Sequence, residues 1–151
     1  MDRNVQNVFF PALKKLRLKN TPKRLAILKI LMKESVFLSP EEVWKKMKRR
    51  FKRIGLPTVY RNLEELSEGN IISKVTHPNR KLYYYLCQNP SHHHHFICFS
   101  CRKVEDIHFC RLRELEEEVK KKIKGKVLSH ILQVNGLCKD CLNKKDEIRA
   151  I

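Results

Sequence analysis

Hydrophobic residues recur at helical spacing in three stretches of the first half of the chain. Thr21, followed by a proline, supplies a hydroxyl cap and a favoured first helical residue, which predicts a helix of about three turns. Ser39 and Glu42 have the spacing of a capping box ahead of a second apolar repeat. Thr58 is predicted to cap a third helix, with Gly69 as its C-terminal stop.

Two short alternating segments follow these helices, at residues 71–75 and 82–86. The polar stretch 77–80 between them contains a proline and an asparagine, so the pattern predicts two strands joined by a tight turn. Three helices followed by a hairpin are typical of a winged helix. In that arrangement the third helix enters the major groove of double-stranded DNA while basic residues on neighbouring elements bind phosphates.

Polar and basic side chains on the predicted third helix and around it are the candidates for DNA contacts. Tyr60 and Arg61 are expected to contact bases, with Asn62 on the same polar face and Thr58 at the start of the helix. The expected phosphate contacts are basic residues outside that helix: Lys15, Lys23, Arg24 and Lys74. Two alternatives stay open, because the basic run 45–53 is also compatible with a solvated helix face and the module with RNA binding.

Charge separates the chain into two parts. Residues 1–86 contain 20 Lys and Arg against 7 Asp and Glu, a net +13, whereas residues 87–151 contain 13 against 9, a net +4. A pI of about 9.9 makes a polyanion the first partner to consider, because basic side chains release counterions from phosphates. The sequence therefore predicts an α+β protein with a DNA-binding domain at residues 1–86 and a small α/β domain at 87–151.

Cysteines and histidines are concentrated in the second part. Two Cys-x-x-Cys pairs, Cys98 with Cys101 and Cys138 with Cys141, have the spacing that lets two sulfurs bind one tetrahedral ion. Together they predict a closed, structural Zn²⁺ site, which leaves no position for a substrate. Two disulfides or four uncoordinated thiols are the alternatives.

The run of four histidines at residues 92–95 leads into a predicted strand. Side chains alternate between the faces of a strand, so His93 and His95 can serve one site and His92 and His94 another. Cys87, six residues before His93, would complete a Cys, His, His set that suits Zn²⁺ once a fourth donor joins it. The alternatives are a solvated histidine loop and a buried, apolar role for Cys87, the role also expected of Cys110.

Further along, the pattern predicts a strand at 104–107, a charged amphipathic helix at 112–124 and a strand at 127–134. His130 lies in that last strand, where spacing alone favours a core histidine. No apolar run is long enough to span a membrane and the first residues lack signal-peptide order, so we expect a cytoplasmic protein with reduced thiols.

Five segments taken together resemble the ferric uptake regulator family over almost the whole chain: residues 21–24, 38–43, 58–63, 92–101 and 136–141. The resemblance implies a winged-helix domain, a hinge and a dimerisation domain whose strands pair across a two-fold axis. It also implies a homodimeric repressor that binds palindromic operators when metal is present and controls metal-uptake or stress genes.

The resemblance also indicates which metal is sensed. The iron and peroxide sensors of the family use a histidine and a carboxylate where this chain has Phe37 and Tyr84, although Asp106 matches a further ligand of that site. The zinc-sensing branch uses a cysteine and two histidines that match Cys87, His93 and His95.

The fourth ligand of the zinc-sensing branch is an aspartate, and Ser73 stands in its place; His77 in the predicted turn is the expected substitute. A second regulatory site of the family implies His92, His94 and His130, with Glu114 beside the aligned Arg113 and Asp106 as another candidate.

The sequence thus predicts a zinc-sensing repressor with structural and regulatory Zn²⁺, in which Fe²⁺ or Mn²⁺ could take the regulatory position. An iron-responsive or peroxide-responsive regulator of the same family is the alternative. A zinc hydrolase or deaminase is disfavoured, because the chain has no His-x-Glu or His-Glu-x-x-His motif. A zinc storage protein would explain the histidines but not the capped third helix or the basic first half.

Overall fold

The structure is a computed structural model that describes residues 3–89 and 91–144. The chain divides into two compact units, Met1–Gln88 and Asn89–Ile151. Cys87 therefore belongs to the first unit, next to its last residue, whereas the sequence boundary after Leu86 assigned it to the second.

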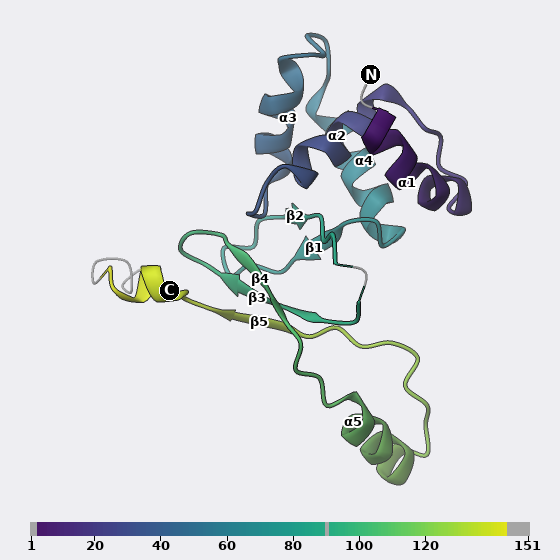
Figure 1. The fold of residues 1–151 in the computed structure, drawn as a ribbon, viewed down its shortest axis with the longest axis vertical. Helices are drawn as coiled ribbons and strands as arrows, with labels where there is room; N and C mark the ends of the chain where they lie inside the picture. Colours follow the sequence, from purple (N-terminus) through teal and green to yellow (C-terminus); the bar gives the residue numbers. More distant parts are fainter. Residues whose placement is uncertain (1–2, 90, 145–151) are drawn as a thin grey trace. The chain divides into compact units, whose positions relative to one another are not determined.

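Four helices make up most of the first unit: α1 (Arg3–Lys15), α2 (Pro22–Met32), α3 (Pro40–Lys48) and α4 (Leu56–Glu68) (Figure 1). The last three are the helices expected from the sequence. The first was not predicted, because Pro11 lies inside it and removes a backbone donor from the helix.

Capping side chains fix where α2 and α3 begin. The Thr21 hydroxyl accepts a hydrogen bond from the backbone N–H of Arg24 at 3.3 Å. The Ser39 hydroxyl accepts from the Glu42 N–H at 3.2 Å, and the Glu42 carboxylate accepts from the Ser39 N–H at 2.8 Å, so the predicted capping box is confirmed. The expectation that Thr58 caps α4 is wrong: Gly55 is the cap, and Thr58 already lies in the first turn with its N–H bonded to the Gly55 carbonyl at 3.1 Å.

The predicted hairpin consists of β1 (Ser73–Val75) and β2 (Tyr83–Tyr85), which pair antiparallel. The turn between them closes with the Arg80 N–H donating to the His77 carbonyl at 3.1 Å. Leu38, in the link from α2 to α3, adds an isolated bridge to Tyr84, with backbone hydrogen bonds of 2.9 and 2.8 Å. Helices and hairpin thus form the winged helix that the sequence predicted.

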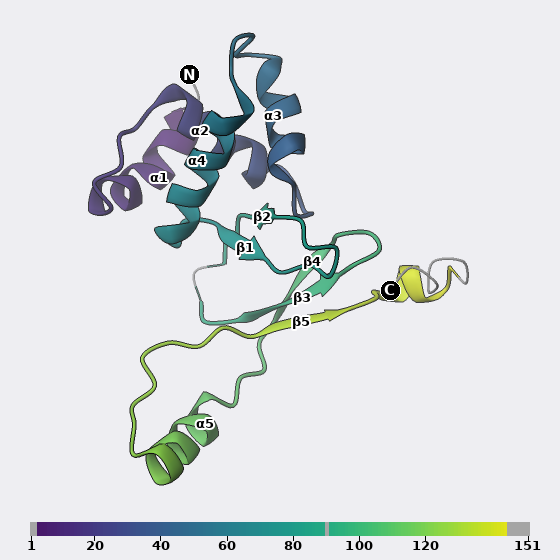
Figure 2. The same ribbon diagram turned by 180° about the vertical axis from the view of Figure 1, so that it is seen from behind.

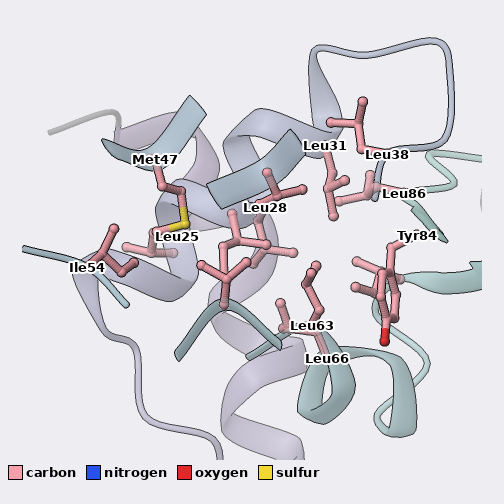
Figure 3. Close-up of a cluster of buried hydrophobic side chains, with 14 of the residues drawn as sticks. Leu25, Leu28, Leu31, Leu38, Met47, Ile54, Leu63, Leu66, Tyr84 and Leu86 are labelled. Atoms are coloured by element: carbon pink, nitrogen blue, oxygen red, sulfur yellow. The ribbon is translucent and has the colours of Figure 1, made fainter. Parts of the chain in front are cut away.

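One apolar core joins the four helices and β2. Leu28 of α2, Leu63 and Leu66 of α4 and Tyr84 of β2 are completely buried and lie together at its centre (Figure 3). The Tyr84 hydroxyl donates to Glu64 at 2.7 Å, so the ring is buried while its polar end is satisfied. The first unit therefore has a core of its own.

Gly69 leaves space at the end of α4 for the side chain of Leu16, the residue after α1. A Cβ atom built on this residue would lie 2.3 Å from Cδ1 of Leu16. The left-handed residue that ends the helix is the next one, Asn70, with φ of 55°. Gly69 is the C-cap, as predicted, and it also leaves room for Leu16.

A three-stranded sheet forms the centre of the second unit (Figure 2). Strand β3 (His94–Cys98) lies between β4 (Val104–Ile107), which is antiparallel to it, and β5 (Gln133–Gly136), which is parallel. The strand predicted at 127–134 is therefore displaced: the apolar alternation of 127–132 marks an exposed segment, with Leu128 88% and Ile131 96% exposed.

A helical excursion separates β4 from β5 (Figures 1 and 2). It contains α5 (Leu112–Glu118) and a π-helical turn at Val119–Ile123, and no residue of these two described elements is buried. The short helix α6 (Lys139–Leu142) follows β5. Among the described residues, no helix is long and apolar enough to cross a membrane.

Candidate metal centres and nucleic-acid interface

Four cysteine sulfurs converge at one end of the sheet in the second unit. Cys98 ends β3, Cys101 follows in the adjoining turn, Cys138 caps α6 and Cys141 lies within it. Their sulfurs all lie within 4.8 Å of one another, and the Cys101 and Cys138 sulfurs are 3.6 Å apart. Because Zn–S bonds are about 2.3 Å, the edges of a tetrahedral Zn–S₄ site are about 3.8 Å. The cluster therefore fits a closed tetrahedral Zn²⁺ site.

The backbone around this cluster favours thiolates. Burial alone raises the pKa of Cys98, but N–H groups of Cys101 and Cys138 donate to its sulfur and lower its pKa to about 6. The Cys138 N–H lies 3.3 Å from that sulfur. Burial together with the neighbouring sulfurs raises the pKa of Cys101 to about 12. Four thiolates this close together repel one another. A divalent cation bound between them would offset that repulsion and replace the protons that the thiols lose.

A second cluster lies on the sheet face that carries His93 and His95. Their Nε2 atoms are 3.0 Å apart, and Oδ1 of Asp106 lies 3.6 Å from the first and 3.8 Å from the second. Asp106 is opposite His95 in the pairing of β4 with β3. The expectation that Asp106 joins the other set of histidines is therefore wrong, because strand register places it here.

Hydrogen bonds orient the donors of this cluster. The Nδ1 atom of His93 lies 2.5 Å from the carbonyl oxygen of Ser91, and because a carbonyl only accepts, Nδ1 is the protonated nitrogen. Its Nε2 therefore presents a lone pair to the site, the arrangement usual for metal-binding histidines. Asn89 donates to the other oxygen of Asp106 at 2.7 Å. Burial, followed by the neighbouring His93, lowers the pKa of His95, which favours the neutral imidazole that a metal needs.

A third cluster lies on the opposite side of β3 and contains His92, His94, His130 and Cys110. Nε2 of His130 lies 3.3 Å from Nε2 of His94 and 3.4 Å from the sulfur of Cys110. The ring of His92 is 4.9 Å from that of His94 and 5.2 Å from that of His130, measured between centroids. The four histidines of the run thus divide between two side-chain clusters by strand alternation, as the sequence predicted.

Three residues have surroundings other than those expected from the sequence. His77 packs against Phe37 and Tyr83, with ring centroids 5.8 and 5.3 Å away, and its Nδ1 accepts from the Asn79 N–H. Glu114 is exposed and pairs with Arg111 at 3.2 Å. Cys110 was not expected to be a ligand, and only the folding of the segment before α5 brings it to the histidines.

An open basic groove of about 680 Å³ in the first unit lies along α4 and the start of α2. Its basic lining residues are Arg17, Lys19, Lys23, Arg24 and Arg61. Lys23 and Arg61 are exposed there, and so is Lys15 at the end of α1. These exposed cationic side chains suit contacts with phosphates or bases.

Two of the predicted DNA contacts are instead buried within the first unit. Arg24, 6% exposed, contacts Glu65 and the Lys19 carbonyl, and it therefore holds the α2 end against α4. Asn62, also 6% exposed, donates to the Thr58 carbonyl at 2.7 Å. Helical spacing alone predicted that Asn62 lies on an exposed polar face. Spacing does not show which neighbouring elements cover that face.

Two further predicted DNA contacts, Tyr60 and Lys74, are engaged with acidic side chains, whereas the half-buried Thr58 lines the groove. The Tyr60 hydroxyl donates to Glu41 at 2.5 Å, and Lys74 pairs with Glu64 at 2.9 Å. The hydrogen bond to Glu41 raises the pKa of Tyr60 and lowers that of Glu41. Both pairs are accessible to solvent, so a phosphate can compete for Lys74 and a base for the Tyr60 hydroxyl.

The basic winged helix and the thiolate and imidazole clusters agree with comparisons to known proteins. Residues 15–135 match the model of the ferric uptake regulator family. The ferric uptake regulation protein of Bacillus subtilis is 35% identical over 85% of this chain and 89% of its own length. The chain belongs to the ferric uptake regulator family. Proteins of this family are metal-responsive transcription regulators that bind DNA as dimers, not enzymes.

Other members and neighbours differ in the signal that they respond to. The peroxide operon regulator of Bacillus subtilis is 28% identical over 89% of this chain and 91% of its own length. A zinc uptake regulator solved with zinc and DNA has a TM-score of 0.70 and 22% identity, covering 95% of this chain and 99% of that one, and so shares the fold. Membership of the family therefore does not fix the signal, which depends on the side chains around the metal clusters of this chain.

Two family positions of the iron-sensing type are closed to metal here. Phe37 and Tyr84, which the resemblance places where iron and peroxide sensors have ligands, are both completely buried in the first unit. The rings of Phe37 and Tyr83 pack in a T-shaped arrangement, with centroids 4.9 Å apart. Phe37 therefore contributes packing without a donor atom, and the Tyr84 hydroxyl is committed to Glu64.

Proposed function

We propose that this protein is a zinc-responsive repressor that binds palindromic operators as a homodimer and controls metal-uptake genes. The observation that carries the proposal is the pair His93 and His95, whose Nε2 atoms are 3.0 Å apart. The two histidines follow Cys87 by six and eight residues. A thiolate and two neutral imidazoles are donors that Zn²⁺ prefers. Cys87 is the proposed third ligand, and Asp106 replaces His77 as the fourth because it already lies beside both imidazoles.

The mechanism follows from where these ligands lie along the chain. Cys87 ends the DNA-binding unit, whereas His93, His95 and Asp106 belong to the second unit. An ion shared by both fixes the angle between them and selects the dimer that fits two half-sites. To shift the population from mostly DNA-incompetent to mostly DNA-competent conformers, the metal ion must bind the competent conformer more tightly by about 5.5 kcal/mol.

Exposed apolar residues in the second unit support the homodimer. Ile123, Leu128 and Ile131 are 72%, 88% and 96% exposed. Several large apolar side chains this exposed within one short segment are often covered by a partner. A second copy of the chain is the proposed partner, because palindromic operators require a two-fold symmetric protein.

Exposed basic residues of the first unit are the proposed contacts to double-stranded DNA. Arg61 in the groove contacts bases, Lys15 and Lys23 contact phosphates, and Arg24 positions α2 through Glu65. Lys74 and Tyr60 join them when DNA displaces their acidic partners. The assignment follows the usual division between base-specific and phosphate contacts.

An iron-responsive or peroxide-responsive regulator is the second candidate. It is favoured by Asp106, since a carboxylate beside two imidazoles suits Fe²⁺ or Mn²⁺ better than thiolate-rich sites do. The two functions differ in whether the Cys87 thiolate is needed.

A gel-shift titration of operator-containing DNA with Zn²⁺, Fe²⁺ and Mn²⁺ tests the proposal. Cys87→Ser and His93→Ala should lose most of the Zn²⁺-dependent shift while keeping the zinc of the four-cysteine site. His108→Ala is the matched control, because His108 belongs to none of the three clusters. Full Fe²⁺ activation of Cys87→Ser would support the second candidate, and unchanged Zn²⁺ activation would refute a role for Cys87.

A further inference from the structure

The cluster on the other side of β3 contains a donor that the family resemblance did not assign. Cys110 lies just before α5, and its sulfur is 3.4 Å from Nε2 of His130. We propose that Cys110 is the thiolate ligand of a separate tetrahedral Zn²⁺ site, completed by His92, His94 and His130. The resemblance already implies the three histidines as a second regulatory site, so the new element is the Cys110 thiolate in place of a carboxylate. All four ligands lie in the second unit, and the assignment therefore stands whether or not Cys87 senses metal.

The distances are those of a tetrahedral site. Because Zn–N bonds are about 2.0–2.1 Å and Zn–S bonds about 2.3 Å, the N–N edge of a tetrahedron is about 3.3–3.4 Å and the N–S edge about 3.5–3.6 Å. The observed separations are 3.3 Å from His94 to His130 and 3.4 Å from Cys110 to His130. All four donor atoms lie within 4.8 Å of one another.

The donor set excludes a hard cation. Three imidazoles and one thiolate contain no oxygen, and Mg²⁺, Ca²⁺ and Mn²⁺ prefer oxygen ligands. The carboxylate that the resemblance offered nearby, Glu114, is exposed and pairs with Arg111. Asp106 lies with His93 and His95 instead. The two clusters on β3 therefore differ in their donor atoms. The Cys110 cluster has only nitrogen and sulfur donors, which are softer than the carboxylate oxygen of Asp106 in the other cluster.

The chain positions of these ligands give the site a structural consequence. His92 and His94 belong to the start of β3, whereas Cys110 and His130 stand immediately before and after the helical excursion 111–129. An ion bound to all four fixes both ends of the excursion to the sheet. It thereby orders the segment that carries the exposed Ile123 and Leu128.

The burial of the four ligands suits such a clamp. His94 is buried, His130 and Cys110 are half-buried and His92 is exposed. Burial, followed by the neighbouring His130 and His92, lowers the pKa of His94. The exposed His92 leaves a path by which an ion can enter and leave.

Cobalt spectroscopy isolates the thiolate of this site. The starting protein is full-length Cys87→Ser with the four-cysteine site filled by zinc, so that Cys110 is the remaining uncoordinated thiol. Added Co²⁺ should give visible bands of tetrahedral intensity and a thiolate-to-cobalt charge-transfer band in the near ultraviolet. In the double variant Cys87→Ser/Cys110→Ser the charge-transfer band should vanish and Co²⁺ affinity should fall by more than about tenfold, the loss seen even for outer-shell partners.

Matched measurements separate this proposal from folding and from the proposed function. Cys87→Ser/Cys110→Asp should bind Co²⁺ without the charge-transfer band, and retention of one zinc per subunit in every variant shows that the second unit is folded. Zn²⁺ should slow amide exchange in residues 112–128 of Cys87→Ser but not of Cys87→Ser/Cys110→Ser. A charge-transfer band that is absent from Cys87→Ser, or that persists without Cys110, would overturn the site, whatever the operator-binding result.

Discussion

The two units of this protein obtain their order from different sources. In the first unit, fifteen buried residues form one apolar cluster, and caps fix the helices around it. In the second unit, the buried residues among those described are Ile97, Cys98, Val104, Cys141 and His94, three of which are candidate metal ligands. From this difference we expect the first unit to fold on apolar burial and the second to depend on bound metal and on a partner.

Loss of a ligand from the four-cysteine site is expected to have the largest effect. Cys138→Ser should unfold the second unit, because structural Zn²⁺ contributes about 10–16 kcal/mol of apparent binding energy in small zinc domains. Zinc content and near-ultraviolet circular dichroism would measure this. His108→Ala is the control, since it leaves all four sulfurs of that site and the other two clusters in place. A Cys138→Ser protein with a folded second unit would show that the second unit does not depend on the metal of the four-cysteine site for its fold.

Truncation of a core residue tests the first unit. Leu28 is completely buried, and Leu28→Ala should lower the free energy of unfolding of this unit by about 2–5 kcal/mol. Denaturant unfolding followed by Trp44 fluorescence reports on it, because this tryptophan packs against the core. Chelation of zinc should not change that transition. A transition that shifts with zinc would mean that the units are not independently stabilised.

The exposed apolar segment before β5 tests the need for a partner. Ile131→Asp places a charge where a second copy is expected to pack, and it should weaken the dimer by about 2–4 kcal/mol. Analytical ultracentrifugation measures the loss. Val8→Asp, also at an exposed apolar position but on α1, should leave the dimer intact. Equal dissociation by both variants would argue against this surface.

The smallest expected effects belong to single DNA contacts. Arg61→Ala should cost about 1–3 kcal/mol of discrimination between operator and mutated operator. Lys15→Ala should weaken binding to all sequences equally and flatten the salt dependence by about one unit. Fluorescence anisotropy at several salt concentrations distinguishes the two. Identical behaviour would mean that α4 does not contact bases.

Sequence patterns predicted best what depends on local chemistry. The capping box of Ser39 and Glu42 and the alternation of His93 with His94 follow from residue spacing, and both are present. The four cysteines likewise converge as their two pairs predicted. The capping box and the histidine alternation depend on near neighbours along the chain and on general backbone geometry. Each Cys-x-x-Cys pair is also local, and the shared preference of the two pairs for one ion predicted that they would meet.

Features that depend on tertiary contacts were missed. Helix α1 contains Pro11, which local rules count against a helix, and packing of Leu13 into the core outweighs that cost. Strand register moved Asp106 to the other histidine pair, and a fold of the chain brought Cys110 to His130. The apolar alternation of 127–132 predicted a strand there, but among the described elements the strand begins only at Gln133.

Hydrogen exchange of the full-length protein, with and without zinc, tests the central claim most directly. Amides of α2 and α4 should keep their protection when zinc is chelated, whereas those of β3 and β5 should exchange orders of magnitude faster. The reason is that the second unit then loses the cross-link that a bound metal ion provides. Equal loss of protection in both units, or protection of β3 and β5 that does not depend on zinc, would contradict it.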